Sequence, residues 1–261
     1  MMLAGKTAIV TGSTSGIGLG IATALAAQKV DLMLNGFGGQ AAIDKLRSSL
    51  AQEHGVKTSY SAADMSKPAE IRAMVQAAQR ELGAVDILVN NAGIQHVAAI
   101  ERFPDDKWDA IIAINLSASF HSIKAALPGM KQRGYGRIIN ISSAHGLVAS
   151  GEKAGYVAAK HGLIGLTKVV AIETANSGVT CNAICPGWVL TPLVQKQVEA
   201  KAEEANIPVE KAKEDLVREK QPMLRFTTPE QIGSLAVFLC DEGAATITGA
   251  ALSIDGGWTA Q

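Results

Sequence analysis

The sequence predicts one doubly wound α/β domain over residues 1–261, with a parallel sheet of about seven strands, helices on both faces and a helical lid at about residues 190–222. Three observations predict this fold class. The chain has 261 residues and 48% of them are hydrophobic, which is enough for one large core. Strand-like and helix-like segments alternate along its whole length, as they do around parallel sheets. A glycine-rich turn joins the first strand to the first helix, and no linker or internal repeat interrupts the chain.

Composition excludes several classes of partner. The formal net charge is +0 and only 18% of the residues are charged, so a partner bound through its phosphate backbone, such as a nucleic acid, is not expected. No apolar run reaches about 18 residues, so we expect no membrane partner. The first residues lack the pattern of a signal peptide, which predicts a cytoplasmic protein. Cys181, Cys185 and Cys240 lack metal-ligand spacing, so we expect reduced, packed thiols and no metal site.

The first strand, Thr7–Val10, runs into a turn with glycines at 12, 16 and 18. Ile17, Ile21 and Leu25 then recur at helical spacing. Glycine permits a tight turn, and it lets backbone N–H groups approach a pyrophosphate at a helix N-terminus. The sequence therefore predicts a dinucleotide-phosphate cradle, built from Gly12, Thr14, Ser15, Gly16, Ile17 and Gly18.

The second strand, 30–34, ends at Asn35, Gly36 and Phe37. At this position an acidic residue selects the free ribose of NAD, and an arginine selects the 2′-phosphate of NADP. The chain has neither, and Phe37 is apolar, so NAD is the expected cofactor. Alternatively, Phe37 merely packs on the fold, and the choice between NAD and NADP then stays open.

Asp64 follows the third strand, 58–62, which comes after a helix over 40–52. Its carboxylate could accept a hydrogen bond from the adenine amino group. The alternative is a turn or N-cap aspartate ahead of the helix over 68–82.

The fourth strand, 86–89, ends in Asn90-Asn91-Ala92-Gly93. Asn91, Ala92 and Gly93 are expected to line the crevice at the carboxyl end of the sheet. The next helix, 109–130, is predicted to face inward through Ile112, Leu116, Phe120 and Ile123. Asn115 interrupts this apolar face, which indicates a specific role or a hydrogen-bonded core amide.

Ser142 and Ser143 follow the fifth strand, 137–141, and the helix predicted over 151–175 carries Tyr156 and Lys160. A tyrosine and a lysine four residues apart lie one helical turn from each other. The lysine charge is expected to lower the pKa of the tyrosine, so that it can take a proton from an alcohol.

The sixth strand, 179–184, leads to Pro186, Gly187, Val189 and Thr191, which we expect at the cofactor. Between Glu199 and Lys220, 12 of 22 residues are charged, which indicates an exposed helical pair that could act as the lid. A helix over 229–240 and a strand over 250–254 complete the predicted domain.

The glycine-rich turn, Asn90-Asn91-Ala92-Gly93, a serine 13 residues before a tyrosine, and Tyr-x-x-x-Lys together resemble the short-chain dehydrogenase/reductase family, whose domain is a Rossmann fold. The resemblance covers the whole chain. It implies Asn115, Ser143, Tyr156 and Lys160 as catalytic residues. Ser143 would hold the substrate oxygen, and Tyr156 would exchange the proton. Lys160 would also bind the nicotinamide ribose, and Asn115 would anchor a water that relays protons.

Gln, His and Lys donors around the serine suit a small hydroxy- or keto-acid. Three stretches, 93–96, 143–150 and 185–188, resemble one subgroup of the family, the bacterial D-3-hydroxybutyrate dehydrogenases. This resemblance implies NAD as cofactor and Gln95, His145, Lys153 and Gln197 as carboxylate ligands. Trp188 and Trp258 could enclose a methyl group. Taken singly, Lys153 could be a solvated lysine and Gln197 an ordinary lid residue.

Relatives in the family are commonly tetramers, so the resemblance also implies a homotetramer. The rival hypotheses are a 3-oxoacyl-thioester reductase or a polyol dehydrogenase of the same family. A more remote one is a non-catalytic nucleotide-sensing protein, which the intact Tyr156 and Lys160 argue against.

Overall fold

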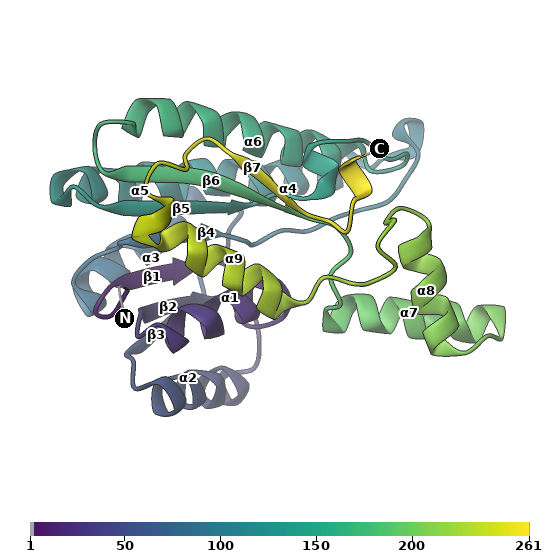
Figure 1. The fold of residues 1–261 in the computed structure, drawn as a ribbon, viewed down its shortest axis with the longest axis horizontal. Coiled ribbons are helices and arrows are strands. Elements are labelled where there is room, and N and C mark those ends of the chain that lie inside the picture. The colour runs from purple at the N-terminus through teal and green to yellow at the C-terminus, as the bar shows by residue number, and fades with distance from the viewer. Residues whose placement is uncertain (1–2, 261) are drawn as a thin grey trace.

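Seven parallel strands form one sheet in the order β3-β2-β1-β4-β5-β6-β7 within residues 3–260, the part of the chain that the computed structural model describes. Figure 1 shows the sheet running through the middle of the molecule. The doubly wound fold predicted from the sequence is confirmed. The strands are β1 Thr7–Val10, β2 Asp31–Asn35, β3 Thr58–Ser61, β4 Ile87–Asn90, β5 Gly136–Ile141, β6 Val179–Pro186 and β7 Ala251–Ile254.

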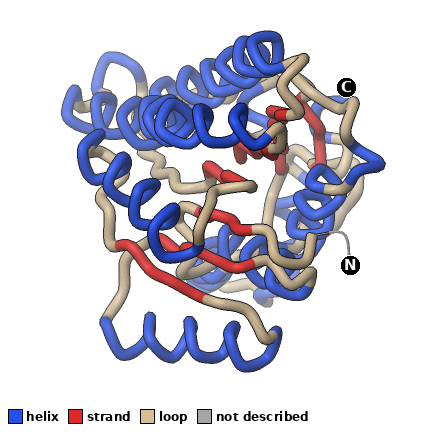
Figure 2. Tube along the Cα trace, turned by 90° about the vertical axis from the view of Figure 1, so that its left-hand side faces the viewer, coloured by secondary structure: helices blue, strands red, loops and turns tan. Residues whose placement is uncertain are grey.

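Two layers of helices cover the sheet, because successive strand side chains point to opposite faces. On β1, Val10 packs into a core shared with α1 (Gly16–Ala27), α2 (Gln40–His54) and α9 (Pro229–Cys240). Ile9, between two such residues, packs into the opposite core with α3 (Pro68–Leu82), α5 (Ala118–Arg133) and α6 (Ala154–Thr174). Figure 2 shows the strands enclosed by these helices. The strand order reverses between β1 and β4, which opens a crevice at their carboxyl ends.

The helix predicted over 109–130 is longer and less regular than expected. It begins as α4, Asp105–Ile112, passes through a π-helical segment, Ala113–Ser117, and continues as α5. Its predicted inner face is partly wrong, because Phe120 is 45% exposed whereas Ile111 and Asn115 are buried. Apolar residues occur all round this helix, so their period does not select one face. Small residues turn inward on α5 instead, among them Ala118 and Ser122.

This same segment, Asp105–Arg133, is long and apolar enough to cross a membrane by length and composition alone. In the fold it packs against α3 and α6, as a core helix does. The absence of a membrane partner stays a prediction.

The charge-rich stretch forms the expected pair of helices, α7 (Pro192–Ala205) and α8 (Val209–Arg218), which project from one side of the domain (Figure 1). Val198 and Ala202 of α7 pack against Ala212 of α8. A salt bridge of 3.1 Å between Lys201 and Glu219 joins the pair on its exposed side. Whether this pair moves as a lid stays a prediction.

Cys181, Cys185 and Cys240 are all buried and unpaired, as predicted. Burial raises the pKa of Cys240 to about 12, so this thiol stays protonated at neutral pH.

Candidate active site

The glycine-rich turn has the geometry that a dinucleotide phosphate requires. Gly12 and Gly16 have φ of 62° and 56°, in the left-handed region that favours glycine. A Cβ on Gly18 would lie 2.3 Å from the Gly12 carbonyl oxygen, so only glycine allows the strand and helix to approach this closely. Ser15 makes no side-chain capping bond, and the first turn of α1 has no acidic residue. Its backbone N–H groups therefore fit a pyrophosphate.

At the end of β2, Asn35 holds the turn in place and Phe37 faces outward. The buried Asn35 accepts a hydrogen bond from Gly12 N at 3.2 Å and donates to the Ala63 carbonyl at 2.9 Å. Thr14 donates to the Phe37 carbonyl at 3.1 Å. The Phe37 side chain is 76% exposed, so the alternative that it packs on the fold is wrong. Its contact with a cofactor stays a prediction.

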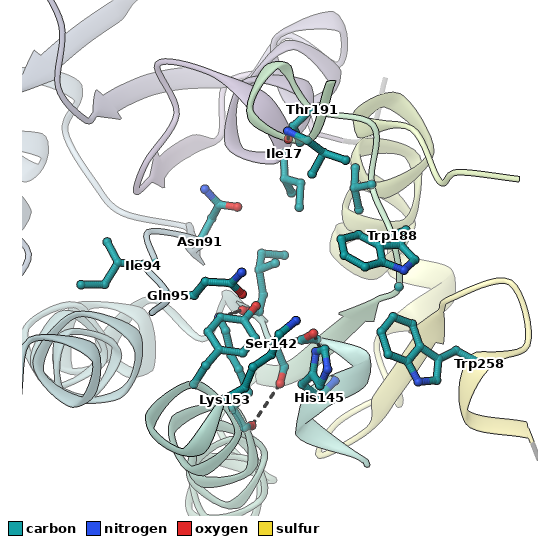
Figure 3. A pocket seen from close by; sticks show the side chains of 18 of the residues that line it. Ile17, Asn91, Ile94, Gln95, Ser142, His145, Lys153, Trp188, Thr191 and Trp258 are labelled. Atoms are coloured by element: carbon teal, nitrogen blue, oxygen red, sulfur yellow. Dashed lines mark hydrogen bonds between the residues drawn. The ribbon is translucent and has the colours of Figure 1, made fainter. Parts of the chain in front are cut away.

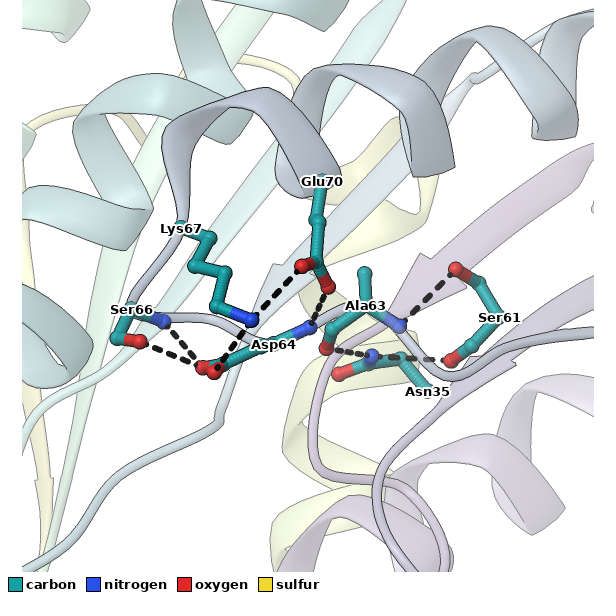
Figure 4. Close-up of polar contacts among 7 residues, drawn as sticks. All are labelled: Asn35, Ser61, Ala63, Asp64, Ser66, Lys67 and Glu70. Atoms are coloured by element: carbon teal, nitrogen blue, oxygen red, sulfur yellow. Dashed lines mark hydrogen bonds and ion pairs between the residues drawn. The ribbon is translucent and has the colours of Figure 1, made fainter.

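Asp64 forms a turn at the end of β3 (Figure 4). Its carboxylate accepts hydrogen bonds from the backbone N–H and hydroxyl of Ser66, at 2.9 and 2.7 Å. These bonds, together with Lys67, hold the pKa of Asp64 below its usual value. Asp64 therefore has the turn role that was one of the two alternatives, and its contact with adenine stays a prediction.

The loop after β4 separates two asparagines that the sequence places side by side. Asn90 is buried and donates to the Asn140 carboxamide at 2.8 Å, so it does not face the crevice. Asn91 does line it, while its amide donates to the carbonyls of Thr11 and Gly12 at 2.8 and 3.1 Å. Asn91 therefore ties the loop to the glycine-rich turn.

Asn115 lies in the π-helical segment and is a hydrogen-bonded, buried amide. Its Oδ1 accepts from Ile94 N at 2.8 Å, and its Nδ2 donates to Ile94 O at 2.9 Å. Both bonds fix the loop that carries Gln95. The predicted water relay through Asn115 stays a prediction.

A cavity of about 610 Å³ opens between the start of α1 and the carboxyl ends of β4, β5 and β6, within the usual size of a small-ligand site. Figure 3 shows Ile17 and Thr191 on one side of it, and Lys153 and His145 on the opposite side. Most predicted site residues border it: Ile17, Asn91, Gly93, Gln95, Ser143, His145, Lys153, Tyr156, Lys160, Gly187, Trp188, Val189, Thr191, Gln197 and Trp258.

Other predicted residues do not line this cavity. Most lie in the glycine-rich turn, at the ends of β2 and β3, or next to residues that line the cavity. They are Gly12, Thr14, Ser15, Gly16, Gly18, Phe37, Asp64, Ala92, Asn115 and Pro186. Three lining residues were missed in the sequence: Ile94, Ile141 and Val194. Ser142, the neighbouring candidate to Ser143, also lines the cavity. Ile94 directly precedes Gln95, Ile141 is the last residue of the predicted fifth strand, and Val194 follows Thr191 in the first turn of α7. All three are neighbours in sequence of predicted residues or elements, and this adjacency is the signal that could have found them.

Ser143 and Ser142 point in different directions, as strand alternation predicts. The Ser142 hydroxyl donates to the Lys160 carbonyl at 3.0 Å. The Ser143 oxygen accepts from His145 N at 3.1 Å and hydrogen-bonds the Tyr156 side chain. Ser143 is therefore the serine placed beside the tyrosine.

The prediction that Tyr156 has a lowered pKa is wrong for this structure. Burial raises the pKa of the phenol, and the hydrogen bond with Ser143 opposes that shift. The Lys160 Nζ lies 5.5 Å from the centre of the Tyr156 ring. Burial also lowers the pKa of Lys160 to about 8, so the lysine holds its positive charge weakly. Desolvation, which the sequence pattern does not show, dominates both groups.

Two donors stand on the wall opposite the glycine-rich turn. His145 is buried, its Nε2 lies 2.9 Å from the Ser150 hydroxyl, and burial and the charge of Lys153 lower its pKa to about 4. His145 is therefore neutral at pH 7. Lys153 is the N-cap of α6 rather than part of the helix as predicted, because α6 begins at Ala154. Burial, and then the charge of Lys220, lower the pKa of Lys153.

Two indoles and a lid residue also line the cavity. Trp188 and Trp258 lie with their ring centres 6.2 Å apart, and His145 meets Trp258 edge to face at 5.0 Å. Gln197, from α7, lines the same cavity. Gln195 instead turns out and donates to Glu199 at 2.6 Å. The site thus combines the hydroxyls of Ser143 and Tyr156 with four amide, imidazole and ammonium donors and an apolar wall.

A glycine-rich cradle beside a Ser-Tyr-Lys cluster on this fold defines an oxidoreductase that works with a nucleotide cofactor. Residues 12–259 match a family model described as enoyl-(acyl carrier protein) reductase. The chain belongs to the short-chain dehydrogenase/reductase family.

The chain is 62% identical to a D-beta-hydroxybutyrate dehydrogenase of Cupriavidus necator, over 100% of both chains. It is 53% identical to another of Rhizobium meliloti, over 98% of this chain and 99% of that one. Among solved structures it resembles L-sorbose reductase from Gluconobacter frateurii complexed with NADPH and L-sorbose. That match has a TM-score of 0.95 and 30% identity, over 99% of this chain and 98% of that one.

Proposed function

We propose that this protein catalyses the NAD-dependent oxidation of D-3-hydroxybutyrate to acetoacetate, and the reverse reduction. One observation carries the proposal: Gln95, His145, Lys153 and Gln197 come from four separate segments and border one cavity beside Tyr156. Lys153 is the cation among them, and the others are neutral donors, a set that suits a single carboxylate. The identity to two D-beta-hydroxybutyrate dehydrogenases supports the same substrate.

In this proposal the carboxylate is held at Lys153, and Ser143 holds the oxygen on the reacting carbon. Trp188 and Trp258 give the methyl group an apolar wall. Tyr156 removes the hydroxyl proton in oxidation and returns it in reduction. Its raised pKa favours the protonated phenol, which suits the reduction directly. For oxidation, a protonated Lys160 would stabilise the phenolate. NAD, when bound, would accept the hydride.

NAD rather than NADP is supported by the end of β2. Residues 35–39 contain no lysine or arginine, and the Asn35 amide is spent on the carbonyls of Ser61 and Ala63. A 2′-phosphate there would meet the exposed Phe37 rather than a cation. NADPH is named for the sorbose reductase, so the proposed use of NAD would separate this chain from that structural neighbour.

The test is an assay of D- and L-3-hydroxybutyrate, each with NAD and with NADP. We expect reduction of NAD with the D-enantiomer, and weak or no reaction in the other three combinations. A polyol and a 3-oxoacyl thioester with NADPH are assayed in parallel. The proposal fails if neither enantiomer reduces a cofactor while one of these substrates reacts.

Replacing Lys153 or Gln197 by alanine is expected to raise KM for the acid, with little change in dinucleotide binding. A hydrogen bond to a charged group is worth about 1.5–3 kcal/mol, so the rise for Lys153→Ala should be roughly tenfold to hundredfold. Steady-state kinetics and dinucleotide titration measure the two effects. Gln195→Ala is the matched control, because Gln195 bonds Glu199 outside the cavity. Unchanged KM in both site variants would remove these residues from the proposed site.

The homotetramer stays a proposal. Phe120 on α5, and Val169 and Ile172 on α6, are 45%, 51% and 77% exposed. Apolar side chains on two adjacent helices fit a contact with a second copy of the chain. Light scattering on the purified protein gives the assembly mass, and a monomeric mass would refute the proposal. The cytoplasmic location and the absence of a nucleic-acid partner likewise stay predictions.

A further inference from the structure

Gln221 is a buried amide outside the cavity, just past the end of α8. Only 1% of the residue is exposed. Its Oε1 accepts a hydrogen bond from the backbone N–H of Trp188 at 2.5 Å. Its Nε2 donates to the Arg225 carbonyl at 2.8 Å. One side chain therefore joins the end of the lid to the segment after β6 and to the return loop before α9.

The space around this amide is built for it. A Cβ on Gly187 would lie 2.4 Å from the Gln221 Oε1, and a Cβ on Gly256 would lie 2.8 Å from its Nε2. Both glycines precede a tryptophan of the cavity wall, by one residue for Trp188 and two for Trp258. The Gln221 amide therefore lies against the two turns that present these indoles.

Backbone bonds complete this junction. Thr227 N donates to Trp188 O at 2.9 Å, and Met223 N donates to Gly256 O at 2.9 Å. The return loop thus runs between the two tryptophan-bearing turns, while Gln221 ties it to the first. In Figure 1 the chain leaving α8 turns back toward the C-terminal segment.

The charges at the same end of α8 act on two of the proposed substrate donors. The charge of Lys220 lowers the pKa of both His145 and Lys153, and that of Glu219 raises the pKa of Lys153. Residues 219 and 220 directly precede Gln221. The end of the lid therefore acts electrostatically on the proposed carboxylate ligands, while Gln221 contacts the backbone of the indole wall.

We infer that Gln221 is a positioning residue: it couples the lid to the indole wall by holding the Trp188 backbone in place. The inference rests on the proposed function only for the identity of the substrate. A buried N–H that loses its acceptor costs stability, or the segment that carries it moves until the N–H finds water. Because Trp188 lies at the cavity, such a movement would change substrate binding without touching the glycine-rich cradle.

Gln221→Met tests this, because methionine has a similar length and no hydrogen-bonding amide. KM for 3-hydroxybutyrate should rise about tenfold or more, because a displaced Trp188 no longer presents its indole to the substrate in the productive position. The dissociation constant for NAD should rise by a smaller factor than KM, since the glycine-rich turn is unchanged and only Gly187 and Val189, which flank Trp188, could disturb the cofactor. Gln221→Glu keeps an oxygen facing Trp188 N, so its KM for 3-hydroxybutyrate should lie between those of the wild type and Gln221→Met. Gln195→Met is the matched lid control, with unchanged KM.

Tryptophan emission gives a readout that needs no substrate. The emission spectrum of Gln221→Met should differ from that of the wild type, and this difference should vanish when both proteins also carry Trp188→Phe. A lowered melting temperature with unchanged KM and unchanged Trp188 emission would overturn the inference and leave Gln221 as a packing residue. If 3-hydroxybutyrate is not a substrate, the emission result still decides the role of Gln221, so the two failures are distinguishable.

Discussion

Replacing Tyr156 by phenylalanine is expected to lower kcat by about 10²- to 10⁴-fold, the usual contribution of a positioned acid or base. The change removes one oxygen. The ring that meets His145 at 6.0 Å is retained, and so is Lys160 with its bond of 2.7 Å to the Ile141 carbonyl. Dinucleotide affinity should therefore change little. Steady-state rates with the acid substrate, together with a dinucleotide titration, separate the two effects.

Tyr135→Phe is the matched control. Tyr135 is also largely buried, and its hydroxyl donates to the Cys240 carbonyl at 3.4 Å, away from the cavity. This variant should keep the wild-type kcat. If Tyr156→Phe retained more than about a tenth of the activity, proton transfer would have to run through another group.

The topology and the central site could be predicted because each depends on local spacing. Glycine at 12 and 16 is required by the backbone geometry of the turn, and a Tyr-x-x-x-Lys pair projects from one side of a helix whatever surrounds it. Parallel strands then bring their carboxyl ends to one edge, so that Asn91, Ser143 and Gly187 meet at one cavity. None of these steps needs knowledge of packing.

The rest depends on burial and on contacts between distant segments, which a linear pattern does not show. Asn90 and Asn91 are chemically identical neighbours, yet one points to Asn140 and the other lines the cavity. The pKa of Tyr156 follows its burial rather than its neighbour Lys160. No pattern in the sequence points to Gln221, because its role depends on a hydrogen bond to Trp188, 33 residues away in the chain.

Replacing Lys160 by methionine is expected to abolish most of the activity and to stabilise the fold at pH 7. Lys160 is 4% exposed, and within residues 3–260 no carboxylate forms a salt bridge with it. The fall of its pKa from 10.5 to about 8 corresponds to a cost of roughly 3 kcal/mol for carrying the charge in the folded protein. Methionine fills similar space without that cost, although the Ile141 carbonyl loses its donor. The net gain should be about 1–3 kcal/mol in the free energy of unfolding.

The pH dependence identifies the cause. Because the folded pKa lies below the unfolded value, the unfolded chain binds more protons between about pH 8 and 10.5, and wild-type stability rises with pH there. The advantage of Lys160→Met should therefore be full below pH 8 and shrink as the pH rises toward 10.5. Denaturant unfolding at several pH values measures it, with the exposed Lys168→Met as control. A difference that stayed constant over this range would mean that packing, and not the buried charge, separates the two proteins. The charge that this site keeps at the expense of stability is the one that the proposed oxidation needs beside Tyr156.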